Sequence, residues 1–134
     1  MVADFGLASI QNHLSSLATR HHNTSQQPGG TLRWMALERL DGEPPSNCSD
    51  LYSFAITAWE LYSSEIPFLT VPDSALPYLV VTREKRPPRP ISLKNEDLWT
   101  LICTCWHADP QKRPVFSDVH EKLKVLSNLG NILQ

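Results

Sequence analysis

The strongest hydrophobic pattern in the sequence predicts a buried helix over residues 50–65. Its apolar positions cover nearly every side of a helical projection: Leu51, Phe54, Ala55, Ile56, Ala58, Trp59, Leu61 and Tyr62. A helix that is apolar on most sides belongs inside a core, with other elements around it. Asn47 or Ser49 is suited to cap its start, and Pro67 to end it.

Three later segments also follow helical spacing. Residues 74–82 predict a short helix with Pro77 in its first turn. Residues 96–106 predict an amphipathic helix capped by Asn95, because apolar residues recur there at intervals of three and four. Residues 117–128 predict a last helix that Ser117 caps and Gly130 follows as a stop.

The remaining segments predict loops. Residues 1–31 are rich in polar side chains and close with Pro-Gly-Gly, although Leu7, Ile10, Leu14 and Leu17 also permit a short helix. Residues 83–94 hold three prolines, five basic residues and one acidic residue, which predicts an extended connector. No segment gives a convincing strand, so the expected fold class is mainly α.

Composition narrows the classes of function. The 134 residues carry 12 Lys and Arg against 14 Asp and Glu, a balance that argues against a basic nucleic-acid binder. Neither a membrane span nor a signal peptide is visible, and three cysteines make no disulfide framework. We therefore expect a cytoplasmic protein with reduced thiols and no membrane partner. Cys103, Cys105 and His107 are too few for a zinc site.

Five short motifs occur in a fixed order: DFG at residues 4–6, GTLRWMALE at 30–38, SDLYSF at 49–54, CW at 105–106 and DPQKRP at 109–114. Any one of them is weak evidence. Their order and spacing resemble the C-terminal half of the large lobe of a eukaryotic protein kinase domain, from the DFG motif onward. The RWM and CW details resemble the tyrosine-kinase-like group, and LRWM with EIPF resembles its fungal members.

The resemblance implies a partial kinase C-lobe, made of the activation segment and about four to five helices. Residues 1–31 would be the DFG motif and activation loop, 32–127 the helical part, and 128–134 a C-terminal tail. The N-lobe and the catalytic loop would be absent. Such a chain would be a truncated part of an ATP-dependent serine/threonine kinase, or of one that also accepts tyrosine.

Roles follow residue by residue from the same resemblance. Asp4 would bind Mg²⁺, Phe5 would pack beneath the site, and Gly6 would let the backbone turn. The substrate-facing segment would hold Thr31, Arg33, Trp34 and Met35. Candidate phosphorylation sites in the activation loop are Ser9, Ser15, Ser16, Thr19, Thr24 and Ser25. The arginine cluster that would receive a phosphate lies in the missing catalytic loop, so a solvated loop is the favoured interpretation.

Two structural roles follow as well. Glu38 would pair with Arg113 across the lobe, in a buried ion pair rather than a weak surface pair. Asp50 would hold the catalytic loop by hydrogen bonds to the backbone of that loop. Without that loop, Asp50 keeps only a favourable place at the positive end of a helix.

Departures from the family pattern limit the expected activity. Leu37 replaces the proline of Ala-Pro-Glu, and Ala55 replaces a glycine. The sequence has no glycine-rich loop, no Val-Ala-x-Lys and no His-Arg-Asp. ATP and Mg²⁺ are cofactors of the full-length family, and we expect this chain alone to bind neither tightly.

Two functions remain open. The chain is part of a protein kinase that acts on a protein substrate, or it is a truncated pseudokinase that serves as a helical interaction module. Because the helix at residues 50–65 would lack its usual neighbours, we expect an exposed apolar side there and self-association.

Overall fold

The computed structural model describes residues 32–132, and every regular element in that range is helical. The longer helices are α3 (Asn47–Ser63), α4 (Glu96–Cys105) and α5 (Phe116–Ile132). The shorter elements are η2 (Leu32–Trp34), α2 (Leu37–Leu40), η3 (Asp73–Ala75), the π-helical turn η4 (Tyr78–Thr82) and η5 (Pro110–Lys112). The prediction of a mainly α fold is confirmed.

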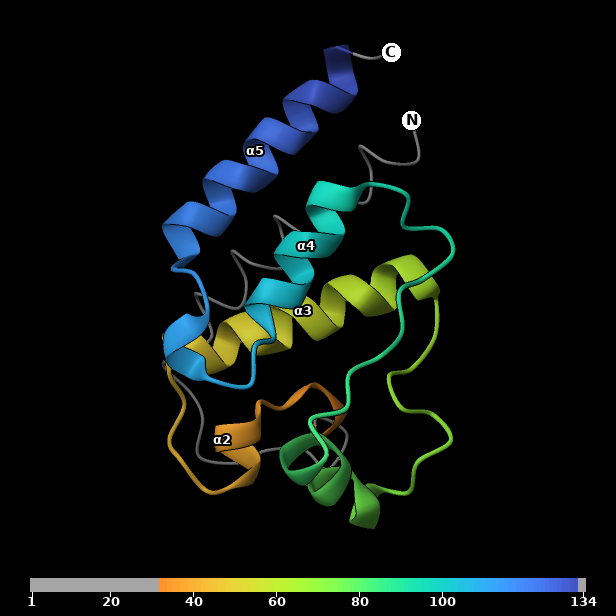
Figure 1. Ribbon diagram of the computed structural model, residues 1–134, viewed down its shortest axis with the longest axis vertical. Coiled ribbons are helices and arrows are strands. Elements are labelled where there is room, and N and C mark those ends of the chain that lie inside the picture. The colour runs from red at the N-terminus through yellow and green to blue at the C-terminus, as the bar shows by residue number, and fades with distance from the viewer. Residues whose placement is uncertain (1–31, 133–134) are drawn as a thin grey trace.

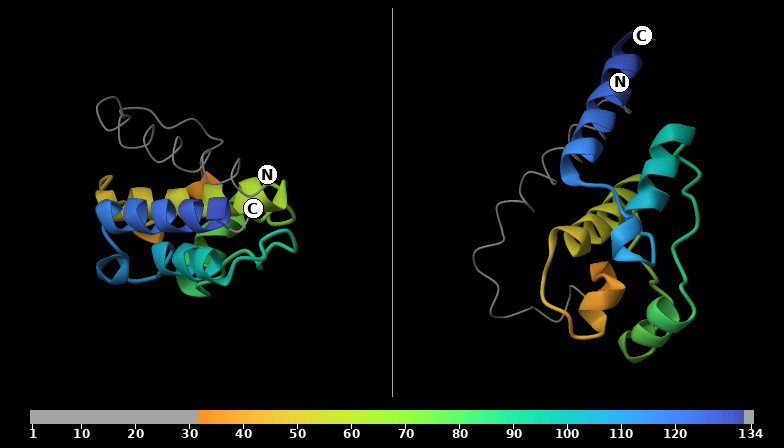
Figure 2. Two further views of the ribbon diagram at one scale, coloured as in Figure 1. Left: turned by 90° about the horizontal axis from the view of Figure 1, so that it is seen from above. Right: turned by 60° about the vertical axis from the view of Figure 1, so that its left-hand side comes forward.

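Helix α3 is the centre of the packing. It crosses the middle of the molecule behind α4, while α2 and η4 lie at one end and α5 extends toward the other (Figure 1). Figure 2 shows α3 and α4 in separate layers, with α5 beside them. Helix α3 contributes to the core from several sides, through residues such as Tyr52, Phe54 and Ile56, whereas α4 and α5 each contribute one face, with Leu98 and Ile102 of α4 and Val119 and Leu123 of α5.

The start of α3 is set by a pair of serines. The Ser49 amide donates to the Ser46 hydroxyl at 3.1 Å, and the Ser46 amide donates to the Ser49 hydroxyl at 2.8 Å. This capping box satisfies two amides that the first turn would leave unpaired. The helix therefore begins three residues before the predicted start, and the predicted caps Asn47 and Ser49 both lie inside it.

The end of α3 also differs from the prediction. The helix ends at Ser63, and Ser64 takes a left-handed conformation with φ of 59°. Its amide donates to the Glu60 carbonyl at 2.8 Å. The helix thus closes with its own left-handed turn, several residues before Pro67 could interrupt it.

The other helix boundaries agree in part. Asn95 caps α4 as predicted, because its side-chain oxygen accepts the Leu98 amide at 3.0 Å. In contrast, α5 begins at Phe116 and runs past Gly130, so the predicted cap at Ser117 and the predicted stop are wrong. The Val115 carbonyl starts this helix by accepting the Asp118 and Val119 amides. A glycine within a helix weakens it but does not end it.

The segment at residues 74–82 is helical but irregular. A short 3-10 turn over Asp73–Ala75 leads through Leu76 and Pro77 into the π-helical turn η4. Pro77 therefore follows the first turn instead of lying in it. The Arg83 amide donates to the Tyr78 carbonyl at 3.2 Å, which is the wide spacing of a π-helix. Residues 83–95 have no helix or strand, as predicted.

The exposed apolar side predicted for α3 is absent from the structure. On α3, Leu61 is the large apolar residue that is exposed. The buried apolar residues of α3 pack against α4, η2 and the connector. The Trp59 indole, for example, donates to the Pro88 carbonyl at 2.6 Å. Exposed apolar side chains lie instead in loops, at the start of η4 and on α5, namely Ile66, Leu69, Tyr78, Ile91, Val115, Val125 and Leu129. No described helix is long and apolar enough to cross a membrane.

We expect Ser46→Ala to lower the free energy of unfolding by about 1 kcal/mol, because it removes the side-chain cap of α3. Ser117→Ala is the matched control, since Ser117 lies within α5 and alanine favours a helix. Urea denaturation monitored by circular dichroism measures both. A larger loss from Ser117→Ala would contradict the assignment of the cap.

Candidate functional site

The described residues contain part of the predicted site. Outside them lie Asp4, Phe5, Gly6 and Thr31, together with the candidate phosphorylation sites Ser9, Ser15, Ser16, Thr19, Thr24 and Ser25. The structure does place Arg33, Trp34, Met35, Glu38, Asp50 and Arg113. These residues come from the segment that leads into α2, from α2 itself, from the start of α3 and from the position directly after η5.

The segment from Leu32 to Met35 is fastened to α3. The Trp34 indole nitrogen donates to a Glu60 carboxylate oxygen at 3.1 Å. The Ser53 hydroxyl donates to the Trp34 carbonyl at 2.8 Å. Within the segment, the Met35 amide donates to the Leu32 carbonyl at 3.2 Å. Since these contacts reach two turns of α3, the segment has a defined place on the core.

Arg33 turns into the protein rather than toward solvent. Its guanidinium donates to the carbonyls of Pro67, Phe68 and Val71, and to the Asp73 carboxylate at 2.9 Å. Its side chain is 18% exposed. Sequence reasoning placed Arg33 on a substrate-facing surface, but its donors are engaged by the loop that follows α3.

Glu38 and Arg113 form a bidentate ion pair. Arg113 Nη1 lies 2.6 Å from Glu38 Oε1, and Nη2 lies 3.0 Å from Oε2. The same guanidinium donates to the Cys48 carbonyl at 2.8 Å and to the His107 carbonyl at 2.9 Å. The Arg113 side chain is fully buried, and that of Glu38 is 15% exposed. One side chain thus joins α2, the start of α3 and the loop before η5.

Tyr52 extends this cluster toward the connector. Two guanidinium groups lie over its ring, with the Arg113 carbon at 5.4 Å and the Arg86 carbon at 5.2 Å from the ring centre. Arg86 also donates to the Trp106 carbonyl at 3.0 Å. Burial raises the pKa of the Tyr52 phenol, so the hydroxyl keeps its proton although two cations lie near the ring. Sequence reasoning missed Arg86, because a single arginine in a basic, proline-rich connector carries no signal of burial.

A search of protein families matches residues 1–123 to the model described as protein tyrosine and serine/threonine kinase. The chain belongs to the protein kinase family. The match includes both partners of the Glu38–Arg113 pair and all three segments that the pair joins. The helical structure is consistent with a partial kinase C-lobe.

Curated protein kinases resemble this chain over most of its length. Serine/threonine/tyrosine-protein kinase HT1 of Arabidopsis thaliana is 34% identical over 118 residues, covering 88% of this chain and 28% of that protein. Serine/threonine-protein kinase STY17 of the same plant is 33% identical over 125 residues, covering 93% and 20%. Human mitogen-activated protein kinase kinase kinase 11 is 32% identical over 125 residues, covering 93% and 14%.

The chain therefore spans between 14% and 28% of the length of these three relatives. These names agree with the tyrosine-kinase-like resemblance, whereas the likeness to fungal members stays a prediction. Asp50, which by the kinase resemblance would hold the backbone of the catalytic loop, lies half-buried in the first turn of α3. Its carboxylate is favourable there because the helix dipole is positive at that end.

The cysteines of this kinase segment are free, and two of them are poor nucleophiles. Cys105 is fully buried, and burial raises its pKa to about 12. Burial also raises the pKa of Cys103. A thiolate is the reactive form, so neither thiol is activated. Within residues 32–132, no group of three or more His, Cys, Asp or Glu side chains is arranged to hold a metal ion.

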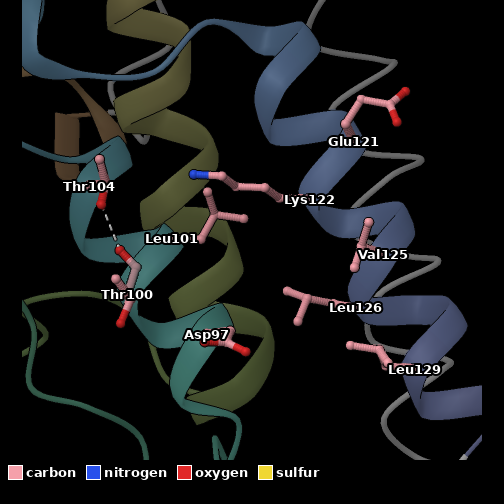
Figure 3. A pocket seen from close by; sticks show the side chains of 9 residues that line it. All are labelled: Asp97, Thr100, Leu101, Thr104, Glu121, Lys122, Val125, Leu126 and Leu129. Carbon is pink, nitrogen blue, oxygen red and sulfur yellow. Dashed lines mark hydrogen bonds between the residues drawn. The ribbon is translucent and has the colours of Figure 1, made fainter.

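A groove of about 410 Å³ lies between α4 and α5, and neither Glu38 nor Arg113 lines it. Its α5 wall is largely apolar and includes Val125, Leu126 and Leu129. Its α4 wall is more polar and includes Asp97, Thr100 and Thr104. Figure 3 shows Leu101, Lys122 and the apolar α5 side chains lying between the two helices. The kinase motifs did not point to this groove.

We expect Glu38→Gln to lower the free energy of unfolding by about 3–5 kcal/mol, because it leaves the buried Arg113 charge uncompensated. Glu96→Gln is the control. Glu96 is 77% exposed and pairs with Arg89, and exposed pairs contribute about 0–1 kcal/mol. Urea unfolding of both variants measures the difference. Equal, small losses would show that the Glu38–Arg113 pair is not a main support of the fold.

Proposed function

We propose that this chain is the activation segment and helical lobe of a protein kinase that transfers phosphate from ATP to serine or threonine in protein substrates, or of one that also accepts tyrosine. The family match over residues 1–123 is the observation that carries the proposal. In the proposed kinase, the segment from Leu32 to Met35 faces the protein substrate. The Glu38–Arg113 pair holds that segment to the helical core.

The chemistry of the reaction requires groups that this sequence lacks. Phosphoryl transfer depends on a catalytic base, a lysine on the phosphates and Mg²⁺ acting together. The sequence has no His-Arg-Asp and no glycine-rich loop. By the kinase resemblance, Asp4 would bind Mg²⁺, but one ligand does not assemble the site. We therefore propose that this segment alone neither binds ATP tightly nor transfers phosphate.

The proposal also includes a place in the cell and the kind of partner. The free cysteines suit the reducing cytoplasm. The net charge of −2 does not favour nucleic acid. A protein substrate is the partner that the family match supports.

We expect the purified 134-residue chain, mixed with Mg²⁺ and radiolabelled ATP, to transfer no measurable phosphate to myelin basic protein or casein. A catalytically complete relative in the same assay is the positive control. Calorimetric titration with Mg²⁺ and ATP should show no tight binding. Robust transfer by the purified chain would overturn the proposed inactivity.

An antibody against residues 83–95, with peptide mass spectrometry of what it captures, tests the kinase assignment in the source cells. We expect a longer protein whose additional peptides include a His-Arg-Asp motif. A protein of 15.1 kDa without such peptides would favour the second function instead.

The second function is a truncated pseudokinase that acts as a helical interaction module, and the groove between α4 and α5 favours it. We propose that a second copy of the chain occupies this groove. On α5, Lys122, Val125 and Leu129 recur at intervals of three and four, the spacing by which one helix packs along another. Val125 and Leu129 are 55% and 47% exposed, so a partner helix can cover them.

In this second function, we expect the chain to self-associate and Val125→Asp to weaken that association by about tenfold. Val115→Asp is the matched control, because Val115 is 59% exposed but does not line the groove. Sedimentation equilibrium measures both variants. A wild-type chain that stays monomeric would exclude the second copy as the occupant.

A further inference from the structure

The loop that follows α3 has an unfavourable backbone and few hydrogen bonds of its own. Ser64 and Phe68 both have positive φ, at 59° and 54°, where a residue with a side chain is strained. The Val71 amide donates to the Phe68 carbonyl at 2.9 Å, which closes one turn. Ile66 and Leu69 on this loop are 46% and 63% exposed. Such a loop needs an outside contact to keep one conformation.

Arg33 supplies that contact. Its two terminal nitrogens reach acceptors from Pro67 to Asp73, at 3.2 Å for the Pro67 carbonyl and 2.8 Å for the Val71 carbonyl. Phe68, one of the two residues with positive φ, also offers its carbonyl to Arg33. A planar guanidinium can meet several carbonyls at fixed angles, whereas a lysine ammonium acts as a single point.

The arginine is itself held in place. Its neighbour Trp34 is bonded to Glu60 and Ser53 of α3, so the backbone at Arg33 cannot follow a moving loop. The Asp73 carboxylate, 64% exposed, balances the charge at the outer end of the contact. The Leu32–Met35 segment and the loop thus form one unit on α3.

We infer that Arg33 is a positioning residue: it fixes the loop of residues 64–73 against the segment from Leu32 to Met35, and it does not bind substrate itself. The inference rests on the proposed function in one respect, that this segment faces a protein substrate. Together the two segments then form a continuous substrate-facing surface, and the loop contributes Ile66 and Leu69 to it.

Hydrogen exchange of the 134-residue chain, followed by mass spectrometry, tests the contact directly. We expect Arg33→Ala to speed exchange of peptides over residues 65–75 by about tenfold or more, with α4 unchanged, because several hydrogen bonds are lost together. Arg33→Lys keeps the charge near Asp73 and should restore only part of the protection. Unchanged exchange in Arg33→Ala, or full restoration by lysine, would overturn the inference.

Two further variants keep the test decisive. Arg39→Ala is the control, because Arg39 donates to the Glu43 carbonyl and does not reach the loop. If Arg33→Ala unfolds the chain, so that α4 also exchanges, Asp73→Asn removes only the exposed charge of the contact. It should speed exchange in residues 65–75 by about two- to fivefold. No local change in Asp73→Asn would then count against the contact.

The link to substrate is tested in the longer kinase that the proposed function requires. Arg33→Ala should raise KM for a protein substrate and leave kcat and the KM for ATP unchanged. A change in kcat alone would overturn the positioning role. If the wild-type longer protein is inactive, the proposed function fails, while the exchange experiment still decides whether Arg33 holds the loop.

Discussion

The buried charge of Arg113 is the constraint on which the rest of the structure depends. A guanidinium with no exposure to water must find compensation inside the protein. Arg113 finds it in the Glu38 carboxylate and in carbonyls of Cys48 and His107, which lie far apart in sequence. Satisfying this one charge therefore brings α2, the start of α3 and the turn before α5 together. The family match contains every segment that the contact joins.

Arginine side chains also donate to backbone carbonyls at several other irregular parts of the described residues. Proline-rich connectors and left-handed turns leave carbonyl groups without helical partners. Arginines donate to many of these: Arg33 to the loop after α3, Arg86 to Trp106, Arg89 to Leu93 and Lys94. The guanidinium of an arginine carries several N–H donors in one rigid plane, so a single side chain can bind several backbone carbonyls of a loop. The fold thus keeps its loops in place although its described residues contain no sheet.

In the proposed function, the groups that would face a substrate are separate from those that would react with it. In the described residues, Trp34 is held by a hydrogen bond to Glu60 of α3, and Arg33 by an ion pair with Asp73. The His-Arg-Asp motif and the glycine-rich loop of the kinase family do not occur in the sequence. The residues that line the groove between α4 and α5 are not among those that Arg33 contacts.

By itself the sequence determined the helical class and the kinase family, because periodic apolar positions and ordered motifs are local or short-range signals. The pairing of Glu38 with Arg113, which lie 75 residues apart, followed only from the resemblance to that family. The sequence could also place Asn95 as a cap, since that signal lies within three residues of the amide it binds. Only the tertiary structure decided that Ser46 starts α3, that Gly130 does not end α5, and that Arg33 and Arg86 turn inward. Those outcomes depend on which carbonyls, rings and carboxylates from distant segments come within hydrogen-bonding distance, and spacing along the chain does not encode that.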